Sequence, residues 1–181
     1  MVYKTRIRYC RIIFACFLMI LVSCNSDHGV GPKSINDQEF GFGGNIVFYG
    51  VWPDSIKRVF LVVFKDPLED TNDFGLTNMR YLSIELPLKV SNYNYNTLDS
   101  SYIPLIPDEG SLSEYHYVAV AQQSTEVISL QRKDWFVTGI YYTGKDATQP
   151  GVLTIPIDSF IDGINIYCDF DNPPPQPPGG E

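Results

Sequence analysis

The chain has few of the residues from which catalytic and metal sites are usually built. Its 181 residues include two histidines, four cysteines and three methionines, which leaves little material for a multi-ligand transition-metal site. Basic residues are also scarce, since 13 Lys+Arg stand against 21 Asp+Glu and give a formal net charge of −8. A nucleic-acid-binding protein needs a basic surface that displaces counterions from phosphates. The composition therefore argues against nucleic acid as a partner.

The sequence also lacks the short motifs that mark common active sites. It contains no G-x-S-x-G, no H-E-x-x-H and no G-x-x-x-x-G-K-[ST]. His28 lies in a polar N-terminal segment, so a Ser–His–Asp or Cys–His arrangement in the body of the chain would have to use His116. Because Val118 and Val120 alternate with it, His116 is expected on an apolar strand face, as a structural or edge-exposed residue. We expect a protein that is not an enzyme, with a small hydrolase centred on His116 as the less favoured alternative.

At its N-terminus the chain has a basic segment followed by a short apolar one. Four basic residues fall within the first eleven positions, and no acidic residue precedes Asp27. From Ile12 to Val22 the sequence reads IIFACFLMILV, which is shorter than the stretch of about 20 apolar residues that spans a bilayer. This order is typical of a cleaved secretory signal peptide.

The four residues Leu21–Cys24 read LVSC, which resembles the lipobox of bacterial lipoproteins. The resemblance implies cleavage before Cys24, a diacylglycerol on its thiol and an acyl group on its new amine. Several acyl chains hold a protein stably on a bilayer, whereas one gives only marginal, reversible binding. Asn25 stands where some Gram-negative bacteria use Asp to retain a lipoprotein in the inner membrane, so the outer membrane is expected. The alternative is an ordinary signal peptide cut near Ser26, with Cys24 discarded.

Composition divides the chain into four parts. The segment after the lipobox is rich in turn formers and reads as a tether with a reach of roughly 20 Å. The last ten residues include five prolines, which lack the N–H that a strand needs, so a polyproline-like, solvent-exposed and disordered end is expected. A ligand for a proline-recognising groove is the alternative for this tail. The expected parts are a signal peptide (1–23), a lipidated flexible tether (24–39), a β domain (40–171) and a disordered Pro-rich tail (172–181).

The body of the chain lacks a helical apolar period and instead repeats short runs rich in Val, Ile, Tyr and Phe. The run 57–65 is apolar on both faces and is expected to be a central strand, while Pro104 makes 101–106 an edge strand or a bulge. In 114–122, Tyr115 and Tyr117 are expected on the face opposite His116. The glycine-rich 41–44 segment is expected to be a flexible entry to the first strand. The predicted strands are 45–49, 57–65, 79–86, 101–106, 114–122, 135–142, 152–157 and 163–170.

Four segments together resemble a known family of all-β domains. GNIVFYG, VFLVVFKD, YIPLIPDEG…YHYVAVAQ and INIYCDF are similar to prealbumin-like sandwiches, including carboxypeptidase-regulatory-like domains. The sequence departs from that pattern by an extra Ser111–Glu114 before the tyrosines. The resemblance implies an all-β fold, a single Greek-key immunoglobulin- or prealbumin-like β-sandwich of about seven or eight strands. It transfers no functional residue.

Aromatic residues make up 14% of the chain, and several lie outside the most apolar runs. Exposed Tyr and Trp side chains stack on sugars or anchor a protein partner. Tyr93 and Tyr95 in the NYNYN segment, together with Trp52 and Trp135, are the candidate ligand-binding residues. The alternative is that these rings cap the open ends of the sandwich.

Two further groups of residues have a possible chemical role that the sequence does not favour. No metal site is expected, and Asp66, Glu69, Asp70 and Asp73 are weak calcium candidates whose spacing does not match the twelve-residue calcium loop. Cys168 alternates in phase with apolar neighbours and is expected to be a small buried hydrophobe with no disulfide partner.

These features predict a membrane-anchored, non-catalytic interaction or accessory module of the cell envelope, without a cofactor. The alternative function is a glycan-binding module that uses exposed Tyr or Trp residues. The expected partners are the membrane, through the lipid anchor, and an envelope protein or glycan. Removing residues 1–23 takes away four basic residues and no acidic one, so the 13 Lys+Arg become 9 and the formal charge becomes −12. The mature domain would therefore be repelled by anionic lipid surfaces.

Overall fold

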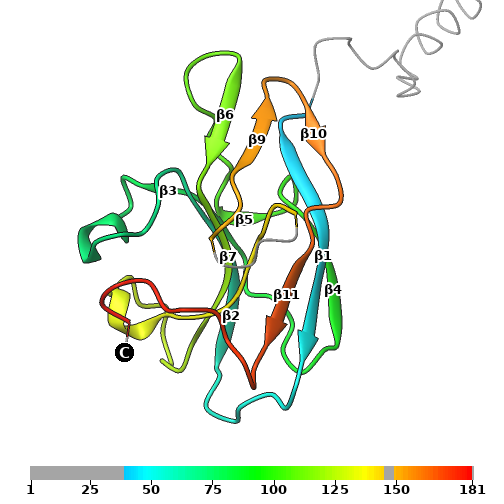
Figure 1. Cartoon of the computed structure of the whole chain (residues 1–181). Coiled ribbons are helices and arrows are strands. Elements are labelled where there is room, and N and C mark those ends of the chain that lie inside the picture. Colours follow the sequence, from blue (N-terminus) through cyan, green and yellow to red (C-terminus); the bar gives the residue numbers. More distant parts are fainter. Residues whose placement is uncertain (1–38, 145–148, 181) are drawn as a thin grey trace, which may run out of the picture. The chain divides into compact units, whose positions relative to one another are not determined.

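The computed structural model describes residues 39–144 and 149–180, which form eleven strands and two short 3₁₀ turns (Figure 1). Cys24, the predicted signal peptide and nearly all of the predicted tether lie outside these residues. Within the described part of the chain, no helix is long and apolar enough to cross a membrane. The strands are β1 (Gly41–Tyr49), β2 (Arg58–Phe64), β3 (Met79–Ser83), β4 (Asn92–Asn96), β5 (Ser101–Ile103), β6 (Leu112–Tyr115), β7 (Tyr117–Gln123), β8 (Phe136–Ile140), β9 (Leu153–Pro156), β10 (Phe160–Ile161) and β11 (Ile166–Asp169).

Nine of these strands form one mixed sheet in the order β10-β1-β11-β8-β7-β2-β3-β5, with β4 paired to β1, and β6 and β9 form a separate two-stranded sheet. β1 runs parallel to β10 and β11, and the other pairings are antiparallel. The all-β prediction is confirmed. Two strands, β4 and β10, arise where the sequence predicted none. The edge position predicted for 101–106 is confirmed by β5, which ends the sheet and stops before Pro104.

β2 is the central strand that the sequence predicted, because it pairs with β3 on one side and over its whole length with β7 on the other. Every side chain from Val59 to Phe64 is buried. Val59, Leu61 and Val63 face the inner core, while Phe60, Val62 and Phe64 face a second, outer core. A strand that is apolar on both faces needs a covering layer on each side.

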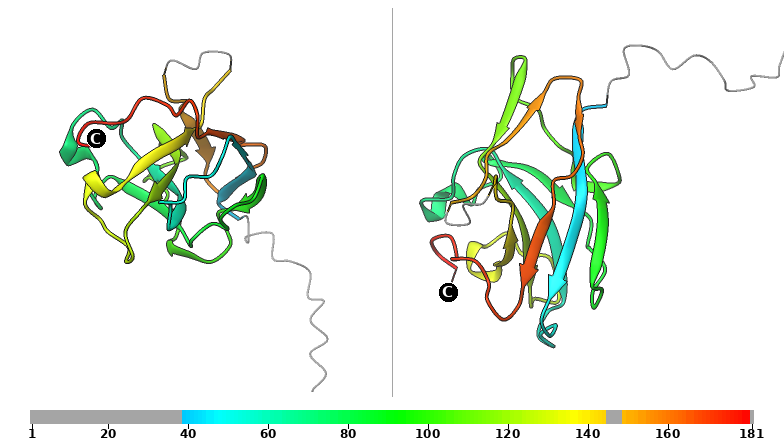
Figure 2. Two further views of the ribbon diagram at one scale, coloured as in Figure 1. Left: turned by 90° about the horizontal axis from the view of Figure 1, so that it is seen from below. Right: turned by 45° about the vertical axis from the view of Figure 1, so that its right-hand side comes forward.

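The inner core forms because the sheet curls, so that β1, β4 and β11 come to lie over β2, β3 and β7. Figure 2 (left) views this arrangement roughly along β1 and β11. Side chains from both ends of the sheet meet in one cluster, which includes Ile46 and Phe48 of β1, Ile166 of β11 and Val118 of β7. Gly44 lets the backbone of Ile164 lie directly against β1, because a Cβ at position 44 would overlap that backbone. The glycine-rich segment is therefore part of the strand, and the prediction of a flexible entry is wrong.

The outer core is covered by loops and not by a second sheet. Trp135 and Phe74 pack on it with their ring centroids 5.7 Å apart. The loop that carries Phe74 also contains the 3₁₀ turn η1 (Thr71–Asp73), and a second turn, η2 (Arg132–Asp134), precedes Trp135. The Arg132 guanidinium lies 5.4 Å from the centre of the Phe74 ring, a distance at which a cation and a ring attract each other.

The C-terminal tail makes fixed contacts with this outer layer, unlike the disordered end that the sequence predicted, while most of its residues are solvent-exposed as predicted. The Gln176 side chain accepts a hydrogen bond from the Val137 amide and donates one to the Val137 carbonyl, both at 2.8 Å. Arg132 donates to the carbonyl oxygens of Pro177 at 2.6 Å and Pro178 at 3.1 Å. Both figures show the tail beside η1 and η2. Proline has no N–H to donate to a neighbouring strand. The Gln176 side chain instead supplies both the donor and the acceptor that a paired strand would have offered to Val137.

A bend at His116 separates β6 from β7 and changes the face on which the preceding tyrosine lies. Tyr115 packs in the inner core beside Val118, whereas Tyr117 packs in the outer core. The prediction that Tyr115 and Tyr117 share a face opposite His116 is therefore wrong. The His116 amide donates to the Lys65 carbonyl at 3.0 Å, which holds the bend against the end of β2.

The contacts of Gln176 predict a stabilising role for the tail. Gln176→Ala is expected to lower the free energy of unfolding by about 1–3 kcal/mol, because its hydrogen bonds to the Val137 amide, the Val137 carbonyl and the Pro174 carbonyl are lost and the two part-buried backbone groups of Val137 lose this partner. Urea denaturation of the chain from Asn25 onward measures this change. The control Gln131→Ala, at an exposed glutamine with no side-chain capping bond, is expected to change it by less than about 0.5 kcal/mol. Equal effects of the two substitutions would contradict a docked tail.

Candidate functional site

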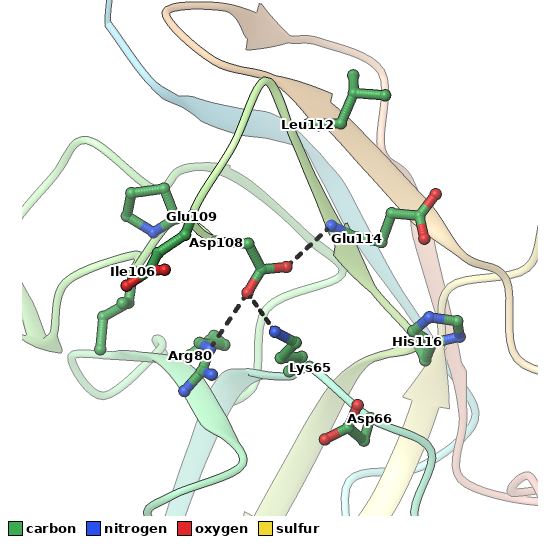
Figure 3. Close-up of a pocket in the computed structure, with 10 residues that line it drawn as sticks. Lys65, Asp66, Arg80, Ile106, Asp108, Glu109, Leu112, Glu114 and His116 are labelled. Carbon is green, nitrogen blue, oxygen red and sulfur yellow. Dashed lines mark hydrogen bonds and ion pairs between the residues drawn. The ribbon is translucent and has the colours of Figure 1, made fainter.

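An open pocket of about 800 Å³ lies where the end of β2, the start of β3 and the segment 106–116 meet (Figure 3). Its lining is mostly charged and polar, with Ile106, Pro107 and Leu112 as the apolar members. A concave site with several converging polar groups is the usual starting point for a binding-site hypothesis. The charged side chains that line it, with the one histidine, are Lys65, Asp66, Arg80, Asp108, Glu109, Glu114 and His116.

Asp108 is the centre of an ion-pair group inside this pocket. Its Oδ1 lies 2.8 Å from the Lys65 Nζ and 4.0 Å from the Arg80 Nε. Its Oδ2 accepts a long hydrogen bond of 3.4 Å from the Glu114 amide. Burial alone would raise the pKa of Asp108, but the hydrogen bonds from Lys65 and the Glu114 amide and the two positive charges lower it below its ordinary value. Figure 3 shows these groups converging on Asp108. The arrangement ties the loop before β6 to β2 and β3.

His116 lies at the side of the pocket, half-buried, with Asp66 and Glu114 among the other lining residues (Figure 3). A histidine that acts as a general base needs a nucleophile within hydrogen-bond reach. None of the described residues that line this pocket is a serine, threonine or cysteine. Among the described lining residues, the pocket therefore offers His116 no hydroxyl or thiol nucleophile to activate.

The predicted ligand-binding aromatic residues are not brought together, and two of them are interior. Tyr95 is 7% exposed and its hydroxyl donates to the Ile164 carbonyl at 2.6 Å; burial raises its pKa. Trp135 is 2% exposed and its Nε1 donates to the Ser129 carbonyl at 2.7 Å. Neither side chain presents a face to a ligand, because its ring fills a core and its polar atom is already bonded. For these two residues the ligand-binding prediction is wrong.

The other two predicted aromatic residues are half-buried against the inner core. Trp52 packs against Phe48 and Phe170 with ring centroids 4.7 Å from each, and its Nε1 donates to the Val90 carbonyl at 3.1 Å. Tyr93 packs against the inner core from β4. These positions fit the alternative that the rings cap the ends of the domain.

β4 does not display its tyrosines as the ligand-binding hypothesis requires. Tyr93 and Tyr95 face inward, and the asparagines that alternate with them face outward. On the two strands next to β4 in the sheet order, Tyr49 of β1 and Tyr167 of β11 are exposed, and a third exposed tyrosine, Tyr102, lies on β5. The sequence analysis missed Tyr49 and Tyr167. The signal was the period of two, since each is out of phase with its buried neighbours, such as Phe48 and Cys168.

The acidic loop uses two of its carboxylates to hold its own backbone. Asp73 accepts hydrogen bonds from the amides of Glu69 at 2.9 Å and Asp70 at 2.7 Å, and Asp70 accepts from the Asn72 amide at 2.8 Å. This is a reciprocal cap on the 3₁₀ turn η1. Across residues 39–144 and 149–180, no group of three or more His, Cys, Asp or Glu side chains is placed to hold a metal ion.

Cys168 is a buried residue on β11, as the sequence predicted. It is fully inaccessible, and burial raises its pKa to about 12, although a hydrogen bond with Thr138 opposes the shift. Gly139 pairs with it on β8, and a Cβ there would meet the Cys168 Sγ at 2.6 Å. A thiol with a raised pKa and no access to solvent is unreactive.

No protein-family model, curated protein or solved structure matches this chain. The resemblances to the lipobox and to prealbumin-like sandwiches therefore stay predictions from the sequence. A function for this protein is therefore inferred from the positions and contacts of its described residues.

The lowered pKa of Asp108 gives a prediction for stability against pH. A group whose folded pKa is depressed stabilises the fold above its unfolded pKa, near 3.8, and this contribution is lost as the pH falls through the folded value. At pH 7, Asp108→Asn is expected to lower the free energy of unfolding by on the order of 1 kcal/mol. The difference from the wild type should shrink below pH 4, as measured by urea denaturation at several pH values. Glu109→Gln, at an exposed neighbouring carboxylate, serves as the control, and a pH-independent difference for Asp108→Asn would contradict the assignment.

Proposed function

We propose that the protein is a lipid-anchored, non-catalytic binding module of the cell envelope, attached through Cys24 to the outer membrane of a Gram-negative bacterium. The observation that carries the binding role is the outer surface of β4, β1 and β11, where two half-exposed tyrosines lie beside outward-facing asparagines. Aromatic rings that remain exposed on a regular sheet are typical of surfaces that contact another molecule. The anchor is supported by the basic start, the short apolar run and the LVSC motif.

We further propose that the domain is a Greek-key sandwich of the immunoglobulin- or prealbumin-like kind, without a cofactor. The curled mixed sheet and the inner core enclosed between its two ends support this proposal. The acidic composition favours an uncharged or basic partner over nucleic acid and anionic lipid. An envelope protein and a glycan are the two partner classes that fit an aromatic surface.

Glycan binding is the alternative form of this role to binding an envelope protein, and the exposed pair Tyr49 and Tyr167 is the observation that favours the glycan. The hydrolase centred on His116 is the least favoured candidate, because none of the described residues that line its pocket is a serine, threonine or cysteine that the histidine could activate.

The anchor predicts how the cysteine variants behave in cells. The wild-type protein is expected in the membrane fraction and labelled by radioactive palmitate, whereas Cys24→Ala is expected to lose the label and to leave the membrane fraction, since the acyl chains supply the attachment. Cys168→Ala is the matched control, because it removes the buried cysteine and should keep both label and location. Labelling of Cys24→Ala at the wild-type level would contradict the anchor.

A further inference from the structure

The surface that supports binding is built by the register of three neighbouring strands. Val47 of β1 is paired with Tyr167 of β11 on one side and with Asn92 of β4 on the other. Two residues along β1, Tyr49 lies diagonal to Tyr167 and on the same side of the sheet. Two residues in the other direction, Asn45 is paired with Asn94. We call the surface formed by Val47, Tyr49, Tyr167, Asn92 and Asn94 the tyrosine–asparagine face; Figure 1 shows the three strands side by side.

The two tyrosines of this face present ring surfaces of nearly the same orientation. Their planes differ by 21° and their centroids are 6.3 Å apart. Tyr49 is 51% exposed and Tyr167 is 59% exposed, so about half of each side chain is in contact with solvent. Each ring also packs against the other. The face of an aromatic ring carries the negative part of its quadrupole and attracts groups with weakly positive hydrogens, such as C–H.

The asparagines add uncharged donors and acceptors beside the rings. Asn92 and Asn94 are both exposed, and each amide carries two N–H donors and one carbonyl acceptor. They face outward because β4 turns its tyrosines inward, where Tyr95 is fixed by its bond to the Ile164 carbonyl. The face therefore combines apolar ring surfaces with amides that can both donate and accept.

The lack of positive charge on this surface favours an uncharged ligand over an anionic one. β1, β4 and β11 contain no lysine or arginine, and Asp169 is their one acidic residue. Asp169 lies at the edge of the face, where its carboxylate accepts hydrogen bonds from the side chain and amide of Asn172 and from the Asp171 amide. No cation on these strands is available to an anionic polymer, and the chain as a whole is acidic. A complementary ligand is uncharged, has apolar C–H faces and carries many hydroxyl groups.

We propose that the tyrosine–asparagine face binds a neutral glycan, with the C–H faces of hexopyranose rings over Tyr49 and Tyr167 and the sugar hydroxyls bonded to Asn92 and Asn94. This inference deepens the proposed binding function and does not depend on lipidation at Cys24. A protein partner fits less well, because the apolar part of the face is small and is bordered by amides.

The test uses the chain from Asn25 to Glu181, which contains the whole compact unit 38–181. Binding is measured by affinity electrophoresis in gels that contain soluble neutral polysaccharides (a β-1,3-glucan, a β-1,4-mannan or an α-1,4-glucan), with an anionic polysaccharide as a comparison. The wild-type chain is expected to be retarded by at least one of the neutral polymers and not by the anionic one.

The substitutions Tyr49→Ala and Tyr167→Ala are each expected to weaken binding by about tenfold, since each removes one stacking surface. Asn94→Ala should weaken it less. Tyr102→Ala is the matched control, because Tyr102 is 52% exposed but lies on β5, away from this face, and its removal should leave the retardation unchanged. Circular dichroism checks that each variant keeps its fold.

Two results would overturn the inference: no retardation of the wild-type chain by any neutral polysaccharide tested, or retardation that Tyr49→Ala and Tyr167→Ala leave unchanged. Capture of a protein through this face without any glycan binding would also overturn it. Palmitate labelling at Cys24 is measured separately, so a failure of the glycan proposal leaves the anchor to be judged on its own result.

Discussion

The fold depends on one constraint, which is that β2 is apolar on both faces and must be covered twice. Its inward side chains are covered by the curling of the sheet, which brings β1, β4 and β11 over them. Its outward side chains pack with Trp135, which follows η2, and with Phe74 from the loop of η1, and the C-terminal tail is bonded in turn to Arg132 of η2 and to Val137 of β8. Features that look incidental in the sequence, such as an acidic loop and a run of prolines, thus serve the same strand.

The same constraint explains which side chains remain exposed and available to a ligand. The side chains of β2 from Val59 to Phe64 are buried in the two cores and are not available to a ligand. At the end of β2, the charged side chains of the pocket are bound to one another through the ion pairs of Asp108. The β4–β1–β11 end of the sheet has its inner side in the core, while Tyr49, Tyr167, Asn92 and Asn94 are exposed on its outer side. Exposed rings and amides can persist there, because each is fixed by the strand that carries it and each remains in contact with solvent.

Several features could be predicted from the sequence because they follow from local pattern. The all-β class, the central strand at 57–65, the edge position set by Pro104 and the burial of Cys168 all follow from period and composition. Other features depend on single events that local pattern does not contain. The bend at His116 moves Tyr115 into the inner core, and the pairing of β4 with β1 turns Tyr95 inward. Two tyrosines at alternate positions form the same pattern whichever face of the sheet they occupy, so local pattern alone does not predict that face.

The way the tail is bound determines which of its residues can be substituted during evolution. Arg132 contacts carbonyl oxygens of the tail, which every amino acid possesses, so the exposed side chain of Pro178 is free to vary without loss of those bonds. Gln176 is different, because its side chain substitutes for a strand partner of Val137 and needs a donor and an acceptor at once. Among related chains, position 176 should therefore tolerate asparagine or glutamine far better than any hydrocarbon residue, while the composition around it drifts.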